Sequence, residues 1–285
     1  MKELVLKARR VPNVPAEALV VSPNFIAGKS VEEICAAEVW EGNRRIALRE
    51  VFDVEGETAK VAEEQAVKVI GEAGKVRKLG YQMSSGLITV DGNAGMYLGE
   101  EMKGGTITVN GNAGSWVGTK MGGGTIEVKG NAGDFVGSSY RGSRLGMKNG
   151  LIVIHGNAGN EVGCWMRGGT IRVKGNSGQF PGMHMSDGTI FVEGDCGGRA
   201  GAQMTGGRVI VVGRLLTVLS SFSFEELRGS VKVGEDKVGG PFYLFTGDVC
   251  ENGVGRLFVG VNRNPHLEWY KRFIETPGDG LCRLV

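Results

Sequence analysis

Histidine and cysteine are the residues of this chain best suited to metal binding or nucleophilic chemistry. Neither His155 nor His184 has a histidine, cysteine or carboxylate at the spacing of an HxH or HExxH ligand set, and the third histidine is His266. The cysteines are odd in number and scattered, at Cys35, Cys164, Cys196, Cys250 and Cys282. This pattern argues against a disulfide framework and against a CxxC metal site. We therefore expect no catalytic, cofactor-binding or metal-binding residue in this chain.

Charge and hydropathy exclude two further classes of function. The chain has 33 basic and 31 acidic residues and a net charge of +2, which leaves no electrostatic footprint for nucleic acid. No run of about 18 apolar residues occurs. The stretch from Met1 to Val5 lacks the apolar core of a signal peptide. We expect a cytoplasmic protein that binds neither nucleic acid nor a membrane.

Glycine dominates the composition, and its positions reveal an internal repeat. Of the 285 residues 50 are glycine. Between Gly86 and Gly213 the chain repeats units such as Gly-Thr-Ile-Thr-Val-Asn-Gly-Asn-Ala-Gly, from Gly105, and Gly-Thr-Ile-Glu-Val-Lys-Gly-Asn-Ala-Gly, from Gly124. Successive units start 19 residues apart, except for one interval of 26 residues that ends at Gly150. A fixed period of this length is typical of a solenoid.

The repeat predicts short strands that stack into a solenoid. Isoleucine and valine alternate with polar residues in each unit, which indicates half-buried strands rather than helices. Equivalent residues should then lie over one another as columns of Ile, Met and Asn, which we interpret as packing and hydrogen-bonding ladders. The Ile column is Ile88, Ile107, Ile126, Ile152, Ile171, Ile190 and Val209; the Met column is Met83, Met102, Met121, Met147, Met166, Met185 and Met204. We predict an all-β fold, a right-handed parallel β-helix of about seven coils with small terminal caps.

The segments outside the repeat divide the chain into three parts. We expect an N-terminal cap over residues 1–65, the β-helix over 66–213, and a C-terminal cap and tail over 214–285. In the first part, strands are predicted at 3–9 and 18–22, and the capping box from Ser30 to Glu33 opens a helix through Ala37. In the last part, strands at 240–247 and 255–260 should form a hairpin, followed by a short helix from Asn264 and a tail that is able to wrap another protein.

Two features of the repeat indicate a surface for a partner protein. Tyr97, Trp116 and Phe135 occupy one column that should point outward by strand alternation. Such a column serves either partner binding or simple stacking between coils. The long unit also carries extra residues around 138–147, and insertions in solenoids often mark the binding face. In that loop Tyr140, Arg141 and Arg144 are able to reach a partner or an anionic ligand, the alternative being a merely solvated loop.

The repeat resembles a known superfamily. The unit Gly-x-Ile-x-Val-x-Gly-Asn-Ala-Gly-x-x-Val-Gly-x-x-Met-x-Gly is similar to the GXGXG repeat of the glutamate synthase large subunit. The C subunits of archaeal formylmethanofuran dehydrogenase and of the bacterial formyltransferase/hydrolase complex share it. The segments most similar to the archaeal protein are Phe25–Ile34, Val39–Asn43, Val136–Gly142 and Phe242–Val249.

This resemblance implies a scaffold subunit in a larger enzyme. The family's complex reduces CO2 to formate at a tungsten or molybdenum pterin site that is fed by iron–sulfur clusters. It then condenses formate with methanofuran at a dinuclear metal site in an amidohydrolase-like subunit. The family places these cofactors in other subunits, so the resemblance implies docking of the two catalytic subunits and no catalytic residue here. The alternatives are the C subunit of a bacterial formyltransferase/hydrolase complex, a glutamate-synthase-like domain protein and a free-standing binding module.

Overall fold

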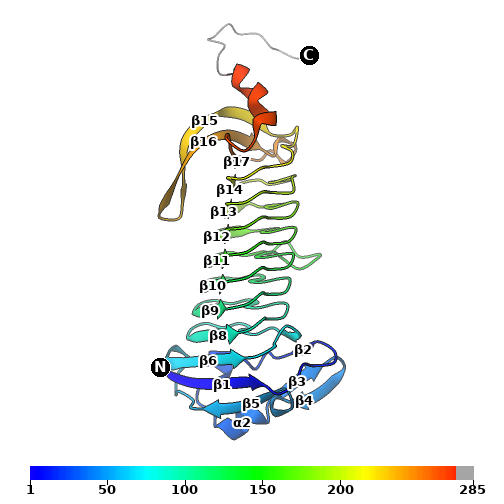
Figure 1. Ribbon diagram of the computed structural model, residues 1–285, viewed down its shortest axis with the longest axis vertical. Helices are drawn as coiled ribbons and strands as arrows, with labels where there is room; N and C mark the ends of the chain where they lie inside the picture. Colours follow the sequence, from blue (N-terminus) through cyan, green and yellow to red (C-terminus); the bar gives the residue numbers. More distant parts are fainter. Residues whose placement is uncertain (274–285) are drawn as a thin grey trace.

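The computed structural model describes residues 1–273, which are mostly β-strand with a few short helices (Figure 1). The predicted all-β class is confirmed. No helix in this part of the chain is long and apolar enough to cross a membrane. The order of strands across the largest sheet is β15 (Ser223–Val233), β16 (Asp236–Gly247), β17 (Gly255–Gly260), β14 (Arg208–Val211), β13 (Asp187–Val192), β12 (Arg167–Val173), β11 (Leu151–Ile154), β10 (Thr125–Val128), β9 (Thr106–Val109), β8 (Leu87–Asp91), β6 (Gln65–Ile70), β1 (Lys2–Ala8) and β5 (Phe52–Gly56).

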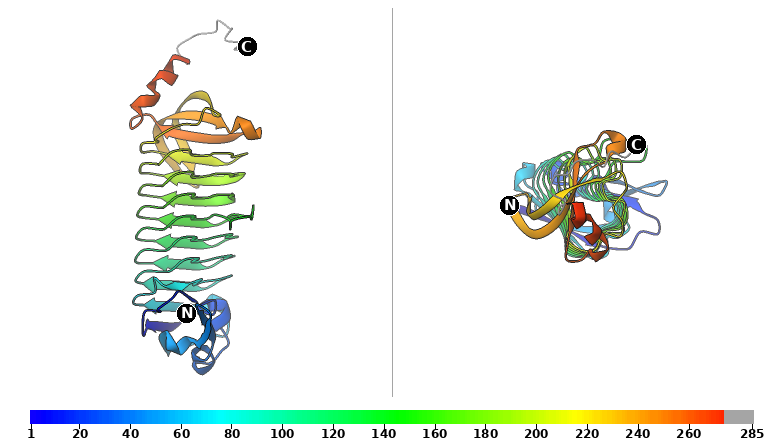
Figure 2. Two further views of the ribbon diagram at one scale, coloured as in Figure 1. Left: turned by 90° about the vertical axis from the view of Figure 1, so that its right-hand side faces the viewer. Right: turned by 90° about the horizontal axis from the view of Figure 1, so that it is seen from above.

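The repeat units stack in register along the long axis of the molecule (Figures 1 and 2). Neighbouring strands from β6 to β14 pair in parallel, and Ile107 lies between Ile88 and Ile126. The long unit keeps this register, since Ile126 pairs with Ile152. Its extra residues therefore leave the stack as a loop. A second line of parallel bridges runs through one residue of each unit, from Ala73 to Leu215.

The core is a set of straight columns between these two lines. The residues of the Ile column are at most 1% exposed, and the seven methionines of the Met column are fully buried. The Ile column extends beyond the repeat at both ends. Leu257 of β17 lies beside Val209, and Leu4 of β1 lies beside Val67. At Gly105, φ is +81° and an added Cβ would lie 2.5 Å from Met83 Cε. Glycine at the start of a unit therefore leaves room for the methionine beneath it.

The asparagine column forms a hydrogen-bonded ladder, as predicted. The backbone N–H of Asn112 donates to Asn93 Oδ1 at 2.9 Å, and that of Asn131 donates to Asn112 Oδ1 at 2.8 Å. The pattern continues to Arg214, whose N–H donates to Asp195 Oδ1 at 2.7 Å. The side chains thus bind the backbone of the next unit, and this satisfies peptide groups at a corner where strand pairing stops.

The N-terminal segment adds a second, four-stranded sheet beside the stack. Its strands, in order, are β4 (Arg44–Ala47), β3 (Glu38–Glu41), β2 (Ala16–Glu17) and β7 (Val76–Arg77). The helices here are α1 (Pro23–Ile26), α2 (Val31–Cys35), η1 (Leu48–Glu50) and η2 (Ala62–Glu64). The predicted capping box is confirmed, since Ser30 and Glu33 bond each other's backbone at the start of α2. The predicted strand at 18–22 is wrong, because Ser22 caps α1 and Pro23 opens that helix.

The C-terminal segment contains one predicted hairpin and one that the sequence did not reveal. β16 and β17 pair antiparallel, as predicted. β15 also pairs antiparallel with β16, and this longer arm lies along the outside of the stack (Figure 1). The predicted helix is observed as the 3-10 helix η4 (Pro265–Phe273), and the short η3 (Val249–Glu251) precedes β17. The proposed wrapping tail and Cys282 lie outside the described residues.

Candidate docking surface

One corner of each repeat unit holds side chains on left-handed backbone. A first position carries Lys78, Tyr97, Trp116, Phe135, Glu161, Phe180 and Arg199, and a second carries Gln82, Glu101, Lys120, Trp165, His184 and Gln203. Their φ angles lie between 50° and 66°. This conformation costs an L-residue about 1–2 kcal/mol, a cost that glycine avoids. The contacts of these side chains must therefore offset the cost of their left-handed backbone.

The first stack consists of the three aromatic residues that the sequence placed in one column. Tyr97 and Trp116 stack with ring centroids 5.2 Å apart and planes inclined by 17°. Trp116 and Phe135 follow at 4.5 Å and 16°. The rings point outward but are only half-exposed, because each covers part of the next. Stacked pairs of this kind contribute about 0.5–1.5 kcal/mol each.

The loop at 138–147 is fixed to the next repeat unit rather than free in solvent. The N–H of Ser139 donates to Cys164 O at 3.1 Å, and the N–H of Gly146 donates to Trp165 O at 3.0 Å. Inside the loop, Ser139 Oγ donates to Ser143 O at 2.8 Å. These bonds tie both ends of the loop to the next repeat unit. The loop is thereby an ordered part of the surface.

The loop brings its own aromatic and basic residues onto the first stack. The ring of Tyr140 lies 5.8 Å from that of Tyr97, measured between centroids. The Nζ of Lys120 lies 4.7 Å above the Tyr140 ring, and the guanidinium of Arg141 lies 5.8 Å from the Phe135 ring. Cations over aromatic faces gain about 0.5–1 kcal/mol at exposed sites. Five of the six predicted surface residues therefore lie together.

Arg144 lies instead on a second stack, which the sequence analysis missed. Its guanidinium is 5.4 Å from the Trp165 ring, and Trp165 stacks on His184 with centroids 4.1 Å apart. Trp165 and His184 hold the second left-handed position of their units, and each is followed by a methionine of the Met column. That shared position is the signal that would have found them. A cavity of about 190 Å³ separates the two stacks and is lined by residues such as Phe135, Tyr140, Glu161, Trp165 and His184.

Two cationic side chains of this surface, Arg141 and Arg144, form no ion pair with a described residue. Lys120 Nζ lies 3.6 Å from Glu101 Oε1. Arg141 and Arg144 are exposed, and neither forms an ion pair with a carboxylate among residues 1–273. Arg141 in the lining of the cavity and Arg144 beside the Trp165 ring therefore carry positive charge next to aromatic rings without a direct carboxylate partner. Aromatic residues with arginine are the composition enriched at protein interfaces.

Burial rather than catalytic activation governs the ionisable groups nearby. Burial, with a smaller effect of Glu161, raises the pKa of the Cys164 thiol to about 12. Burial lowers the pKa of His184. At the other end of the surface, burial raises the pKa of Glu100, although Lys78 opposes the shift. A thiol with so high a pKa is a poor nucleophile at neutral pH.

Within residues 1–273, no group of three or more His, Cys, Asp or Glu side chains could hold a metal ion. His155 Nε2 lies 2.6 Å from Glu127 Oε1 on the adjacent strand, and its Nδ1 lies 3.2 Å from Lys174 Nζ. This group links neighbouring units on the outer face of the sheet.

Comparison with known proteins places the chain in a family. No family model matches the chain. The C subunit of the tungsten-containing formylmethanofuran dehydrogenase 2 of Methanococcus maripaludis strain S2 is 57% identical over 274 residues, which cover 94% of this chain and 100% of that protein. A second such protein from Methanococcus maripaludis is 47% identical over the same length. The chain belongs to the family of formylmethanofuran dehydrogenase C subunits.

Other members of this family match over a shorter stretch. The C subunit of the molybdenum-containing formylmethanofuran dehydrogenase 1 of Methanosarcina barkeri is 39% identical over 98 residues, which cover 34% of this chain and 33% of that protein. In the tungsten-containing enzyme of Methanothermobacter wolfeii the matched stretch covers 36% of the relative. The chain thus spans about a third of the length of several relatives in these alignments and all of the Methanococcus proteins.

A solved structure is similar over nearly the whole chain. It is the formyltransferase/hydrolase complex from Methylorubrum extorquens in complex with methylofuran. One of its chains superposes with a TM-score of 0.81 and 29% sequence identity, and the match covers 90% of this chain and 99% of that one. The resemblance inferred from the repeat and its flanks is confirmed.

Proposed function

We propose that this chain is the non-catalytic scaffold, the C subunit, of a formylmethanofuran dehydrogenase complex that reduces CO2 and fixes it as formylmethanofuran. The observation that carries this proposal is the 57% identity over the full length of the Methanococcus protein. The repeat, the flanking segments and the loop at 138–147 all fall within the matched length. The surface built from stacked rings and exposed arginines adds a structural reason, because it is suited to protein contacts.

The scaffold itself is proposed to be a right-handed, single-stranded parallel β-helix. The in-register parallel pairing from β6 to β14, together with the second line of bridges from Ala73 to Leu215, supports one coil for each repeat unit. We assign the coils to residues 66–213, with caps formed by 1–65 and 214–285. β1 and β17 each add one further parallel strand beyond these bounds, so the caps continue the core column.

The proposed docking surface consists of Tyr97, Trp116, Phe135, Tyr140, Arg141 and Arg144, to which the structure adds Trp165 and His184. Its partners are the pterin-metal catalytic subunit and the amidohydrolase-like subunit of the cytoplasmic complex. The tungsto- or molybdopterin, the iron–sulfur clusters and the dinuclear metal site are assigned to those other subunits. A fixed aromatic surface suits this role, because little side-chain entropy is lost when rings already held in place enter an interface.

Purification of the tagged full-length chain from its native cells tests the proposal. We expect a pterin-metal subunit and an amidohydrolase-like subunit to purify with it in fixed ratio, and metal analysis of the assembly to detect tungsten or molybdenum. Isolation of the chain alone at every salt concentration would refute the scaffold role.

A second candidate is the C subunit of a formyltransferase/hydrolase complex without tungsten or molybdenum. The match that covers 99% of a chain in the Methylorubrum extorquens complex favours it. Metal analysis of the same native assembly separates the two candidates. An assembly that contains formyltransferase and amidohydrolase subunits but neither metal would establish the second.

A further inference from the structure

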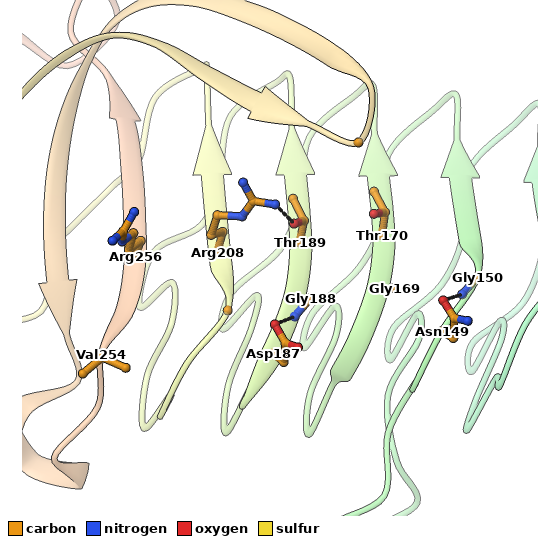
Figure 3. Close-up of a pocket in the computed structure, with 12 residues that line it drawn as sticks. Asn149, Gly150, Gly169, Thr170, Asp187, Gly188, Thr189, Arg208, Val254 and Arg256 are labelled. Atoms are coloured by element: carbon orange, nitrogen blue, oxygen red, sulfur yellow. Dashed lines mark hydrogen bonds between the residues drawn. The ribbon is translucent and has the colours of Figure 1, made fainter.

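A second cavity, which shares no lining residue with the cavity at the docking surface, lies between the outer face of the sheet and the β15–β16 arm (Figure 3). Its volume is about 660 Å³, and it lies over the first residues of strands β11 to β14 and β17. Gly234, at the turn of the arm, belongs to its lining. Cavities of about 300–1,000 Å³ are the usual size of small-molecule sites.

The arm that covers the cavity is held in place from several sides. Arg172 donates to Val233 O at 2.7 Å and pairs with Asp236 next to the turn. Arg208 donates to Lys232 O at 3.1 Å. Apolar residues of the arm also pack against the sheet in a separate cluster that includes Phe191, Ile210, Val231, Phe242 and Phe258. The cavity is therefore preformed by the fold.

Two arginines face this cavity from adjacent strands at the same register position. Arg208 of β14 pairs directly with Arg256 of β17, and strands in a sheet lie about 4.8 Å apart. Both side chains point to the outer face, because the residues that follow them, Val209 and Leu257, are buried. The same position holds threonine in four earlier strands, Thr106, Thr125, Thr170 and Thr189. Arginine replaces threonine only where the arm covers the sheet.

Neither arginine is neutralised by the described residues. Arg208 donates to the neutral Thr189 Oγ1 at 3.0 Å and to a backbone carbonyl, and the Arg256 side chain has no hydrogen bond or ion pair among residues 1–273. Like charges directly opposite on neighbouring strands destabilise a sheet. The acidic residue in the lining, Asp187, accepts a hydrogen bond from the N–H of Gly188 at 2.7 Å. The lining thus holds two guanidinium groups against the single carboxylate of Asp187, which leaves it with a net positive charge.

We propose that this cavity binds a small molecule through a phosphate or carboxylate group held between the guanidinium groups of Arg208 and Arg256. Guanidinium groups bind both anions through paired N–H donors. Thr189 fixes the Arg208 side chain, and the hydroxyl of Thr170 lies in the same row as a further donor (Figure 3). The rest of the 660 Å³ cavity leaves space for the remainder of the molecule.

Thermal unfolding and calorimetry of the full-length chain test this site. Inorganic phosphate and the tricarboxylate citrate are titrated separately at constant ionic strength, with chloride as the reference anion. We expect saturable binding of at least one anion and a rise in Tm of about 3 °C at tenfold excess over Kd. The anion that binds more tightly identifies the head group.

The decisive variant is Arg256→Thr, which restores the residue of the earlier strands. We expect its Tm without added anion to equal or exceed that of the wild type, because a like-charge contact is removed, and its Kd for the anion to weaken at least tenfold. Arg214→Thr is the charge-matched control, since Arg214 is exposed and lies outside this cavity, and it should bind as the wild type does.

Three outcomes would overturn the proposal. The first is that neither anion binds the wild type saturably. The second is that Arg256→Thr binds as tightly as the wild type, or that Arg214→Thr loses binding equally. The third is that Arg256→Thr weakens assembly of the complex while the wild type binds no small anion, which would assign the arginines to an acidic segment of a partner protein.

Discussion

Trp116 and Phe135 stack across neighbouring repeat units with ring centroids 4.5 Å apart and planes inclined by 16°. Both rings stand on left-handed backbone, with φ of 63° and 66°. The stack therefore combines a local backbone cost with aromatic contacts that lie half-exposed on one side of the molecule. The same rings therefore stabilise the fold through stacking and are exposed enough to contact a partner protein.

Replacement of Trp116 should separate these two roles. Trp116→Ala removes its stacking on Tyr97 and Phe135, which is worth about 1–3 kcal/mol for two pairs. We expect the isolated chain to stay folded with that loss in the free energy of unfolding, measured by denaturant titration, and assembly with partner subunits to weaken. Trp40→Ala is a suitable control, because Trp40 is 39% exposed and its ring contacts Arg45 and none of the surface residues. Equal assembly of the Trp116 variant and the wild type would remove Trp116 from the interface.

His184 should make the stability of the chain depend on pH. Burial lowers the folded-state pKa of His184, whose ring stacks on Trp165, below the unfolded value of about 6.5. The unfolded state then binds more protons below that pH, so stability should be constant above about pH 6.5 and should fall as the pH drops toward the folded pKa. Denaturant midpoints between pH 5 and 8 measure this change. His184→Phe, which keeps an aromatic ring on Trp165, should reduce the slope, and an unchanged slope would contradict the assignment.

Two glycines with nearly the same φ should respond differently to alanine. Gly105 has φ of +81° and Gly142 has φ of +82°. An added Cβ at Gly105 would lie 2.5 Å from Met83 Cε and 2.8 Å from Gly86 O, whereas nothing lies within 4 Å at Gly142. Gly142→Ala should therefore cost only the backbone strain of about 1–2 kcal/mol.

Gly105→Ala should cost clearly more than that, because backbone atoms of the preceding unit cannot move aside without disturbing strand pairing. Chemical denaturation of the two variants measures the difference. Equal losses of stability would show that close packing between units does not require glycine at the start of the unit.

The sequence predicted the repeated part of the fold because each stacked column has one residue type. The isoleucines, methionines and asparagines recur at fixed spacing, and their environments in the structure repeat with them. The β15–β16 arm was not predicted, because β15 is mostly polar and exposed and alternates only over its last three residues. The strand expected at 18–22 failed for a local reason, the helix-opening pair Ser22 and Pro23.

The docking surface was only partly visible in the sequence. Tyr97, Trp116 and Phe135 share one repeat position, so their neighbourhood followed from the period. Trp165 and His184 share another position, but the earlier units hold glutamine, glutamate and lysine there, which hides the column. The path of the loop depends on hydrogen bonds to Cys164 and Trp165, and no local sequence pattern predicts these bonds.

The central claim is that this surface docks partner subunits, and the most direct measurement is the mass of the native complex that carries Arg141→Glu and Arg144→Glu together. The two exposed guanidinium groups have no carboxylate partner within residues 1–273, so their reversal should leave the isolated chain folded and replace attraction toward an acidic partner with repulsion. Arg44→Glu with Arg49→Glu, exposed on the N-terminal segment, is the charge-matched control. We predict that the first double variant fails to assemble, with a mass close to that of the single chain, while the control assembles fully. A full-mass complex with the first variant, at the same concentration and salt, would contradict the account.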